Sequence, residues 1–255
     1  MDKVIIVIPA KGNSKRLPYK NFLNVGTLSL VGHAMFRAMR CNLGPIYVST
    51  DDDAMWGKVG DINYEAMKLS YIDDNWYIPK PVKRSFDLSR DCRAWEVCLD
   101  IIEKECVDAT TIILTLPTSP FCQPKHLQEA YRMFLENDRK PVMSVTKCEF
   151  NPNTLMYFQK EEYRQVYPYL EPEGELFFWN SHIIAEGSLD DIFLSNGAVW
   201  VCDVEMLKEK RDQYIDGMLG YEMDEISGFD VNTKLDLICA NAIWKEKELV
   251  DKEVM

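Results

Sequence analysis

Four cationic side chains crowd into a short stretch near the start of the chain. Residues 8–21 read IPAKGNSKRLPYKN and carry Lys11, Lys15, Arg16 and Lys20, whereas the whole chain has a formal net charge of −12. The stretch follows an apolar run that predicts a buried strand, and loops at the carboxyl ends of such strands border the ligand crevice of open α/β sheets. A basic loop in an acidic protein therefore indicates a site for an anionic ligand.

The same loop also offers uncharged hydrogen-bond donors. Gly12 allows backbone N–H groups to approach an oxyanion closely, and Asn13 and Ser14 add polar side chains. Donors and cations together suit a polyphosphate. The pattern matches neither the GxGxxG loop of dinucleotide-binding folds nor the GxxxxGK(S/T) loop of P-loop ATPases. A solvated basic turn in front of a helix is the alternative interpretation.

A second candidate site lies near the end of the chain, in the stretch Phe229-Asp-Val-Asn-Thr233. Asp230 precedes a helical pattern and could cap that helix, but Thr233 is better placed for the cap. Asp230 is then free to bind a cation such as Mg²⁺, which prefers oxygen ligands. Asn232 can add an oxygen there but no charge.

The acidic run Thr50-Asp-Asp-Asp53 allows two interpretations. It could be the DxD metal motif of a glycosyltransferase that uses nucleotide sugars. It could instead cap the helix that follows, because carboxylates are favourable at a helix N-terminus, and this is the interpretation we favour. Arg84 also has two interpretations: a ligand-binding residue, or a surface arginine paired with Asp87 or Asp91.

Composition narrows the class of protein. The chain has 255 residues, 47% of them hydrophobic, which suffices for one large α/β domain or two small ones. With 41 acidic against 29 basic side chains, it is not a general binder of nucleic acid or of anionic membranes. Its eight cysteines include no CxxC pair, so neither a zinc site nor a disulfide framework is indicated. With no signal-peptide pattern and no apolar stretch near the ~20 residues of a membrane span, we expect a soluble cytoplasmic protein.

Short apolar runs alternate with helical patterns along the chain. The predicted strands are 3–8, 45–49, 111–116, 141–146 and 198–202. Apolar residues at helical spacing occur at 31–38, 95–106 and 127–135. The near-continuous apolarity of the strands predicts burial on both faces. The alternation therefore predicts a doubly wound, mostly parallel α/β sheet with helices on both faces.

Residues 150–195 interrupt this alternation, because they are rich in aromatic residues, proline and glutamate and show weak periodicity. They could pack on a partner subunit or form a long lid over the site. We favour the subunit contact. The expectation is a single domain over residues 1–255 that forms a homodimer through this excursion.

The basic loop resembles a known signature, that of the CMP-sialic acid synthetase (acylneuraminate cytidylyltransferase) family. The family motif P-A-R-G-G-S-K-x-(I/L)-P-x-K-N is largely matched between Pro9 and Asn21, with Lys11 in place of the usual arginine. Further matches follow in the family's order: Val48-Ser-Thr-Asp51 with V-S-T-D, Arg84–Asp91 with R-P-x-E-L-(A/S)-x-D, Leu116-Pro-Thr-Ser-Pro120 with Q-P-T-S-P, Asn196-Gly-Ala198 with N-G-A, and residues 229–236 with V-D-I-D-T-x-x-D/L-D. The resemblance spans nearly the whole chain and implies a three-layer α/β/α nucleotidyltransferase fold of Rossmann-like type.

The resemblance also implies a role for each matching residue. The triphosphate of CTP would be held by Lys11, Gly12, Asn13, Ser14 and Lys20, and the cytosine and ribose by the backbone near Ala10 with Asn21, Arg84 and Ser89. The acceptor-binding residues would be Leu116, Thr118, Ser119 and Asn196. In the family, the aspartate that matches Asp230 binds Mg²⁺, so Mg²⁺ is the expected cofactor. The catalytic residues would be Lys20, Asp230 and Asn232.

Three departures from the family concern the metal and the acceptor. Asn232 stands where the family has a second acid, Leu116 replaces a glutamine associated with the sugar, and residues 188–192 replace an arginine-bearing stretch. The sequence predicts an enzyme that transfers CMP from CTP to a small acceptor and releases pyrophosphate. A sialic-acid-like or other acidic sugar is the favoured acceptor. The alternatives are a KDO-type sugar, a sugar phosphate or a phosphonate as acceptor, or a catalytically impaired nucleotide-binding homologue.

Overall fold

The first apolar run forms a strand in the middle of a sheet. The computed structural model describes residues 2–12, 14, 16–53, 56–57, 59–61, 77–84, 94–148, 156–158, 166–168 and 192–253. It divides the chain into two units, one made of residues 1–145 with 195–255 and the other of residues 146–194.

The elements of the described residues alternate as the sequence predicts. The strands are β1 (Val4–Ala10), β2 (Asn24–Val25), β3 (Leu28–Ser29), β4 (Ile46–Thr50), β5 (Lys80–Lys83), β6 (Thr111–Leu114), β7 (Val142–Lys147), β8 (Met156–Phe158), β9 (Val166–Pro168), β10 (Phe193–Asp203) and β11 (Leu219–Glu222). The helices are η1 (Lys20–Phe22), α1 (Leu30–Cys41), α3 (Ala94–Glu105), α4 (Pro124–Glu136), α5 (Val204–Lys210) and α6 (Lys234–Glu253). None of these helices has the length and apolar composition needed to span a bilayer.

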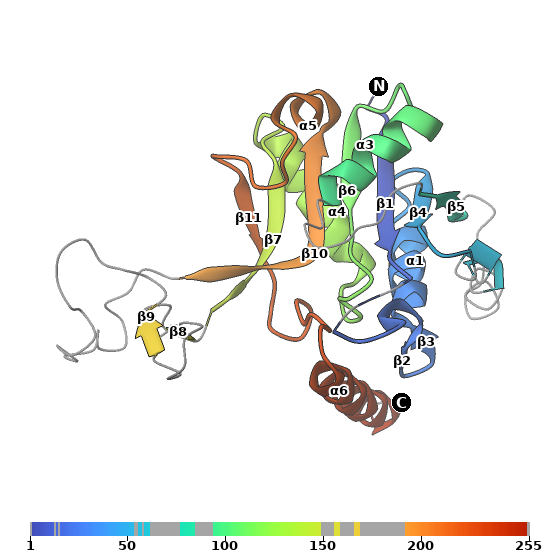
Figure 1. Cartoon of the computed structure of the whole chain (residues 1–255), viewed down its shortest axis with the longest axis vertical. Helices are drawn as coiled ribbons and strands as arrows, with labels where there is room; N and C mark the ends of the chain where they lie inside the picture. Colours follow the sequence, from blue (N-terminus) through green and yellow to red (C-terminus); the bar gives the residue numbers. More distant parts are fainter. Residues whose placement is uncertain are drawn as a thin grey trace. The chain divides into compact units, whose positions relative to one another are not determined.

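Within the described residues, seven strands form one sheet in the order β11-β7-β10-β6-β1-β4-β5 (Figure 1). β1 runs parallel to both β4 and β6, whereas β10 runs antiparallel to β6. The prediction of a mostly parallel sheet is confirmed. Ala10 pairs with Thr50, and Val7 pairs with Leu114. The carboxyl ends of β1, β4 and β6 therefore meet at one edge, where a ligand crevice is expected.

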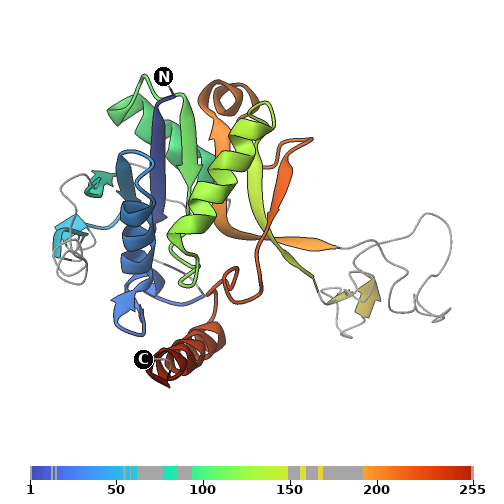
Figure 2. The same ribbon diagram turned by 180° about the vertical axis from the view of Figure 1, so that it is seen from behind.

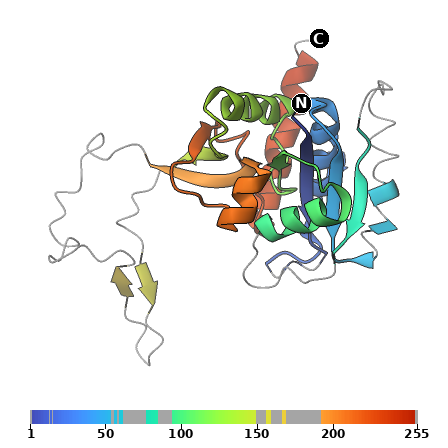
Figure 3. The same cartoon turned by 90° about the horizontal axis from the view of Figure 1, so that it is seen from above.

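Helices cover both faces of this sheet, because β1 is apolar on both sides. Ile6 and Ile8 pack in a core with α1 and α4, whereas Ile5 and Val7 pack in a second core with α3 and α5. α3 and α5 lie in front of the sheet in Figure 1, and α1 and α4 lie in front of it in Figure 2. Figure 3, which looks along the strands, shows the sheet between the two helix layers.

α6 lies at the end of the sheet where β1 ends (Figures 1 and 2). A third, smaller core joins it to the rest of this unit, with Val25, Leu30, Phe121, Val231 and Ala240 all buried. The small hairpin β2–β3 and the loop after β6 contribute to this core. α6 is thereby held beside the loops that carry the candidate site.

The predicted strands differ from the observed ones in limits and in number, and the largest difference in limits is at β10, which begins at Phe193 rather than at 198. β1 continues to Ala10, so the predicted loop begins inside the strand, and β6 stops at Leu114 rather than at 116. β5 and β11 were not predicted at all. They are the edge strands of the sheet, and their sequences KPVK and LGYE contain proline, glycine and charged residues. Edge strands tolerate these residues, which weaken the apolar pattern of a strand.

The second unit contains an antiparallel pair, β8 and β9, in which Tyr157 lies opposite Tyr167. Its limits, 146 and 194, are close to those of the predicted excursion at 150–195. Most of that excursion lies outside the described residues. A role for it as a dimer contact or as a lid stays a prediction.

Candidate active site

Two loops from opposite ends of the chain meet at the end of the sheet. Lys20 opens η1, in the loop after β1, and its Nζ donates to Oδ1 of Asn232 at 3.2 Å. Arg16 Nη2 donates to the same oxygen at 2.8 Å. Lys20 is only 9% exposed, so its cation is held in a partly desolvated position. The structure thus brings together Lys20, Asn232 and Asp230, as the sequence predicts, and adds Arg16 to them.

Asp230 lies beside Asn232 and is held by it. Its Oδ2 accepts a hydrogen bond from Nδ2 of Asn232. Its Oδ1 is buried and has no hydrogen-bond partner among the described residues. A buried carboxylate oxygen without a donor is costly unless a cation occupies its open side. Asp230 therefore fits a cation ligand better than a structural aspartate.

The helix cap beside Asp230 is made by another residue, as predicted. Thr233 Oγ1 accepts from the backbone N–H of Asp236 at 3.2 Å, and Asp236 Oδ2 accepts from the N–H of Thr233 at 2.7 Å. This reciprocal pair is a capping box at the start of α6. Burial alone would raise the pKa of Asp236, but backbone hydrogen bonds from Asn232 and Thr233 outweigh it and lower that pKa. Asp230 takes no part in this cap, and its Oδ1 stays available.

The described residues around Asp230 suit a metal that is completed by substrate. They contain no group of three or more histidine, cysteine, aspartate or glutamate side chains that could hold a metal. Mg²⁺ is typically held by one or two carboxylates together with substrate phosphates, so Asp230 fits such a site once a nucleotide is bound. Asn232 does not add a ligand in this arrangement, because its oxygen accepts from Arg16 and Lys20 and its NH₂ group faces Asp230.

Asp51 organises the opposite side of the loop. Its Oδ1 accepts from the Gly12 N–H at 3.0 Å and lies 3.2 Å from Nη2 of Arg84. Arg84 Nη1 also donates to Ser49 Oγ at 3.1 Å. Arg84 is 2% exposed, so its interpretation as a surface arginine is wrong. Neither the helix-cap nor the DxD interpretation of the acidic run predicted this role. Asp51 joins the loop after β1 to β4 and to Arg84.

Gly12 is required at its position by close packing. A Cβ there would lie 2.3 Å from Cβ of Asp52, closer than two side chains can approach. Its N–H was expected to face an oxyanion, but in this structure it donates to the carboxylate of Asp51. Asn21, which is buried, donates to the backbone oxygen of Lys11 at 2.8 Å. These contacts fix the course of the loop.

The remaining nucleotide-binding predictions have mixed outcomes. Ala10 is fully buried at the end of β1, so only its backbone could contact a nucleotide, as expected. Lys11 and Ser14 are half-buried in the loop. Asn13 and Ser89 lie outside the described residues.

The four predicted acceptor residues lie around the segment that follows β6, residues 115–119. Leu116 is half-buried, and Gly197 has φ +70, a conformation that favours glycine; a Cβ there would also displace the end of the Leu116 side chain, 2.6 Å away. Thr118 and Ser119 are buried, and Oγ of Ser119 has no hydrogen-bond partner among the described residues. Asn196 is buried as well. Its Oδ1 accepts from Ser144 and from the N–H of Ala198, which makes it part of the scaffold in this structure.

Arg37 supports this segment from α1, although it belongs to none of the motifs described above. Its guanidinium donates from Nε to Thr115 Oγ1 at 3.0 Å, from Nη1 to the backbone oxygen of Ser119 at 2.6 Å, and from Nη2 to that of Leu116. Arg37 is 1% exposed. The signal was present in the sequence, because Arg37 is spaced from Ala34 and Cys41 as residues of the buried helix face are.

The segment is also joined to the loop that carries Asp230. The N–H of Val231 donates to the backbone oxygen of Thr118 at 2.8 Å. The rings of Phe121 and Phe229 meet edge to face at 6.4 Å. The predicted acceptor segment and the candidate metal ligand therefore share one framework.

Comparison with known proteins finds similarity to cytidylyltransferases. A family model described as Cytidylyltransferase matches residues 5–59, which contain the basic loop, α1 and β4. The pseudaminic acid cytidylyltransferase of Campylobacter jejuni is 23% identical over 228 residues, which cover 81% of this chain and 93% of that protein. An N-acylneuraminate cytidylyltransferase of Streptococcus agalactiae is 22% identical over 240 residues, 92% of this chain. This chain spans about half of that relative's length, 52%.

A solved structure of CMP:2-keto-3-deoxy-manno-octonic acid synthetase complexed with CTP has a similar fold. Its TM-score is 0.62 at 15% sequence identity, and the match covers 96% of this chain and 100% of that one. The three-layer α/β/α nucleotidyltransferase fold is confirmed. The predicted resemblance is confirmed as a distant one: the chain is similar to cytidylyltransferases of this kind at 22–23% identity.

Proposed function

We propose, from this kinship with the cytidylyltransferases, that the protein is a CTP-dependent nucleotidyltransferase which transfers CMP to an acidic sugar and releases pyrophosphate. The observation that carries the proposal is the convergence of two cations and a buried carboxylate oxygen. Lys20 and Arg16 meet at Asn232, and the neighbouring Asp230 has an oxygen without a donor. A nucleoside triphosphate with a divalent cation is the ligand that satisfies both kinds of group.

The proposed reaction is an attack by an acceptor hydroxyl on the α-phosphorus of CTP. A new oxygen–phosphorus bond forms, the bond from the α-phosphorus to the bridging oxygen breaks, pyrophosphate leaves with the electron pair, and the proton of the hydroxyl passes to solvent. Negative charge grows on the phosphate oxygens, and the side chains of Lys20 and Arg16 stabilise it. Asp230 would hold Mg²⁺, which supplies Lewis-acid neutralisation of the phosphate charge.

The internal contact between Gly12 and Asp51 has a consequence for this reaction. The carboxylate of Asp51 accepts from an N–H that the family resemblance assigns to phosphate. If CTP takes that N–H, Asp51 keeps its ion pair with Arg84, so the carboxylate is not left without a partner. Nucleotide binding then exchanges one acceptor of the Gly12 N–H for another, which requires only a local change in the loop.

The acceptor is proposed at the level of a nine-carbon or related acidic sugar. The relatives act on pseudaminic acid and on an N-acylneuraminate by name, and both names denote acidic sugars. Leu116 replaces the family's glutamine with an apolar side chain, so we expect an ordinary sialic acid to be a poor substrate. A KDO-type sugar, a sugar phosphate or a phosphonate is the alternative. We also propose a cytoplasmic homodimer in which residues 150–195 form the subunit contact.

The experiment is a pyrophosphate-release assay with CTP and Mg²⁺ across a panel of acceptors. The panel contains N-acetylneuraminate, other nonulosonates, KDO, sugar phosphates and phosphonates, ranked by kcat/KM. Lys20→Ala should weaken CTP binding by about 1.5–3 kcal/mol, the contribution of a hydrogen bond to a charged group. Asp230→Ala should abolish Mg²⁺-dependent turnover and leave the fold intact. Lys208→Ala on α5, which pairs with Glu205 on the surface, is the matched control and should change neither quantity.

Three results would contradict the proposal. CTP binding by calorimetry that is unchanged in a folded Lys20→Ala variant would remove the role of the basic loop. Tight CTP binding without turnover on any acceptor would mean a nucleotide-binding protein without catalysis. A large preference for N-acetylneuraminate would show that the interpretation of Leu116 is wrong.

A further inference from the structure

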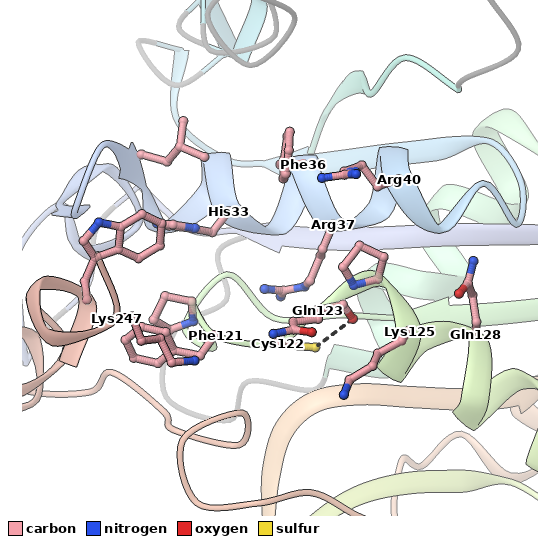
Figure 4. A pocket seen from close by; sticks show the side chains of 14 residues that line it. His33, Phe36, Arg37, Arg40, Phe121, Cys122, Gln123, Lys125, Gln128 and Lys247 are labelled. Atoms are coloured by element: carbon pink, nitrogen blue, oxygen red, sulfur yellow. Dashed lines mark hydrogen bonds between the residues drawn. The ribbon is translucent and has the colours of Figure 1, made fainter. Parts of the chain in front are cut away.

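A pocket of about 650 Å³ lies on one face of the first unit, next to the segment 115–119, which is hydrogen-bonded to the lining residue Arg37. It is bordered by α1, by the segment from Pro120 to the start of α4, and by α6 (Figure 4). Among the residues that the structure describes, no lining residue is one of those predicted to bind nucleotide, metal or acceptor. Its volume is in the range of small-molecule sites in proteins.

The charge of this pocket is opposite to that of the chain. The lining residues within the described part of the chain include Arg37, Arg40, Lys125 and Lys247 and no aspartate or glutamate. The whole chain has 41 acidic and 29 basic side chains, so a lining of this size would be expected to contain acids. The pocket also includes the first residues of α4, and a helix N-terminus carries a partial positive charge. Both features favour an anion.

Arg37 gives the pocket a buried cation. Three of its hydrogen bonds go to the segment 115–119, whereas a guanidinium has five N–H groups. No described carboxylate forms an ion pair with it, and its hydrogen-bond acceptors are a hydroxyl and two backbone oxygens. A buried cation that is neutralised by no acid attracts an anion strongly, because little solvent screens it.

The walls of the pocket contain flat rings. Phe36, Phe121 and Trp244 line it, and the Nζ of Lys247 lies 5.2 Å from the centre of the Phe121 ring. His33 packs edge to face against Trp244 at 5.1 Å and is hydrogen-bonded through Nε2 to the backbone oxygen of Val25. Aromatic side chains beside cations form a surface on which a planar ligand can stack while its anionic group meets the cations.

We propose that this pocket is a binding site for a small phosphorylated compound that carries a flat ring. A phosphate monoester has about two negative charges near neutral pH, which suits several cations better than a single carboxylate does. The pocket shares no described lining residue with the proposed CTP site, so the two ligands would bind at different places. The proposal does not depend on the proposed reaction.

The test is a titration with phenyl phosphate, followed through the indole NMR signals of the protein. The chain has six tryptophans, and a Trp244→Phe variant identifies the signal of Trp244. Phenyl phosphate should shift that signal with a dissociation constant on the order of 1 mM, as suits a ligand of its size. Cyclohexyl phosphate, which has no flat ring, and inorganic phosphate should bind more weakly. These probes separate the contribution of the ring from that of the phosphate.

Two single charge-reversal variants on α6 show where the probe binds. Lys247→Glu should weaken phenyl phosphate binding by about tenfold or more, because it replaces a lining cation by an anion. Lys245→Glu makes the same change on the same helix at an exposed residue outside the lining, and should leave binding within about twofold. Arg40→Glu, at an exposed lining position, is the second variant if Lys247→Glu does not fold.

The outcomes separate this site from the proposed CTP site. Loss of phenyl phosphate binding in Lys247→Glu but not in Lys20→Ala, together with the reverse pattern for CTP, supports the proposal. Binding that is lost in Lys20→Ala and kept in Lys247→Glu overturns it, because the probe would then occupy the basic loop, and the proposed function would still stand. Equal weakening by Lys245→Glu and Lys247→Glu also overturns it, since the attraction would then be a general effect of surface charge.

Discussion

Replacing Arg37 by methionine separates a role in positioning from a role in stability alone. Methionine has a side chain of similar length without the charge or the N–H donors. The change therefore removes three hydrogen bonds to the segment 115–119. Thr115 Oγ1 still donates to the backbone oxygen of Ala198, and the backbone oxygen of Ser119 still accepts from the N–H of Cys122 at 3.3 Å. The acceptor that loses its donor among the described residues is therefore the backbone oxygen of Leu116. The change therefore affects the geometry of the segment that is expected to hold the acceptor.

The expected loss of stability follows from these contacts. A hydrogen bond to a charged group contributes about 1.5–3 kcal/mol, and the Leu116 oxygen left without a donor costs about 1–3 kcal/mol. Removal of a buried charge offsets part of this loss. We expect a net destabilisation of about 3–5 kcal/mol, which is less than the total stability of most domains of this size. The Arg37→Met variant should fold at 25 °C and unfold at a lower urea concentration.

The kinetic effect should fall on the acceptor. Misplacement of a binding segment by about 1 Å can cost up to ~100-fold in rate, so kcat/KM for the acceptor should fall by about 10- to 100-fold. KM for CTP should stay within about twofold, because no predicted phosphate contact is touched. Arg37→Lys, which keeps the charge and one donor group, should recover part of the loss. Urea unfolding and steady-state kinetics with each substrate varied in turn measure these effects.

Arg139→Met is the matched control. Arg139 also holds several groups, including Asp2, Asp203 and Thr111, but at the amino end of the strands. Its loss should lower stability and leave KM for the acceptor unchanged. If Arg37→Met loses stability but keeps both KM values, as expected for Arg139→Met, Arg37 has only a structural role and our reasoning is refuted.

Three further predictions follow from the loops and termini. Asn232→Asp should lower the Mg²⁺ concentration for half-maximal turnover by about tenfold, because it adds a second negative charge beside Asp230. It should also make the melting temperature depend on Mg²⁺. A titration that shows neither change would place residue 232 away from the ion. Thr233→Ala should cost about 1 kcal/mol and lower the melting temperature by about 2–4 °C through loss of the cap on α6, which calorimetry can measure. Burial alone would raise the pKa of Asp2, but hydrogen bonds from Thr110 and other groups lower it to about 2. Its contribution to stability is therefore present above about pH 4 and is lost as the pH falls toward 2, so Asp2→Asn should flatten the stability curve in that range.

The sequence by itself determined the elements whose signals are local. Continuous apolar runs predicted the central strands, because strands buried on both faces need apolar residues at every position. Helical spacing predicted α1, α3 and α4, and the position of Thr233 predicted the cap of α6, because a cap is decided within one turn of chain. The cation cluster of the loop at 11–20 was visible for the same reason. The edge strands β5 and β11 were not predicted from the sequence, because one-sided exposure leaves them without a continuous apolar pattern.

Only the tertiary structure decided which of these residues meet. Arg16 and Asn232 are 216 residues apart in sequence, and the order of strands in the sheet brings their loops together. The same holds for Asp51, whose acidic run read locally as a helix cap but whose carboxylate joins Gly12 to Arg84. The burial of Arg37 likewise depends on the face that α1 turns toward α4 and the segment 115–119. Such contacts arise from the packing of elements far apart in the chain, and a local pattern carries no information about the partner that packing will supply.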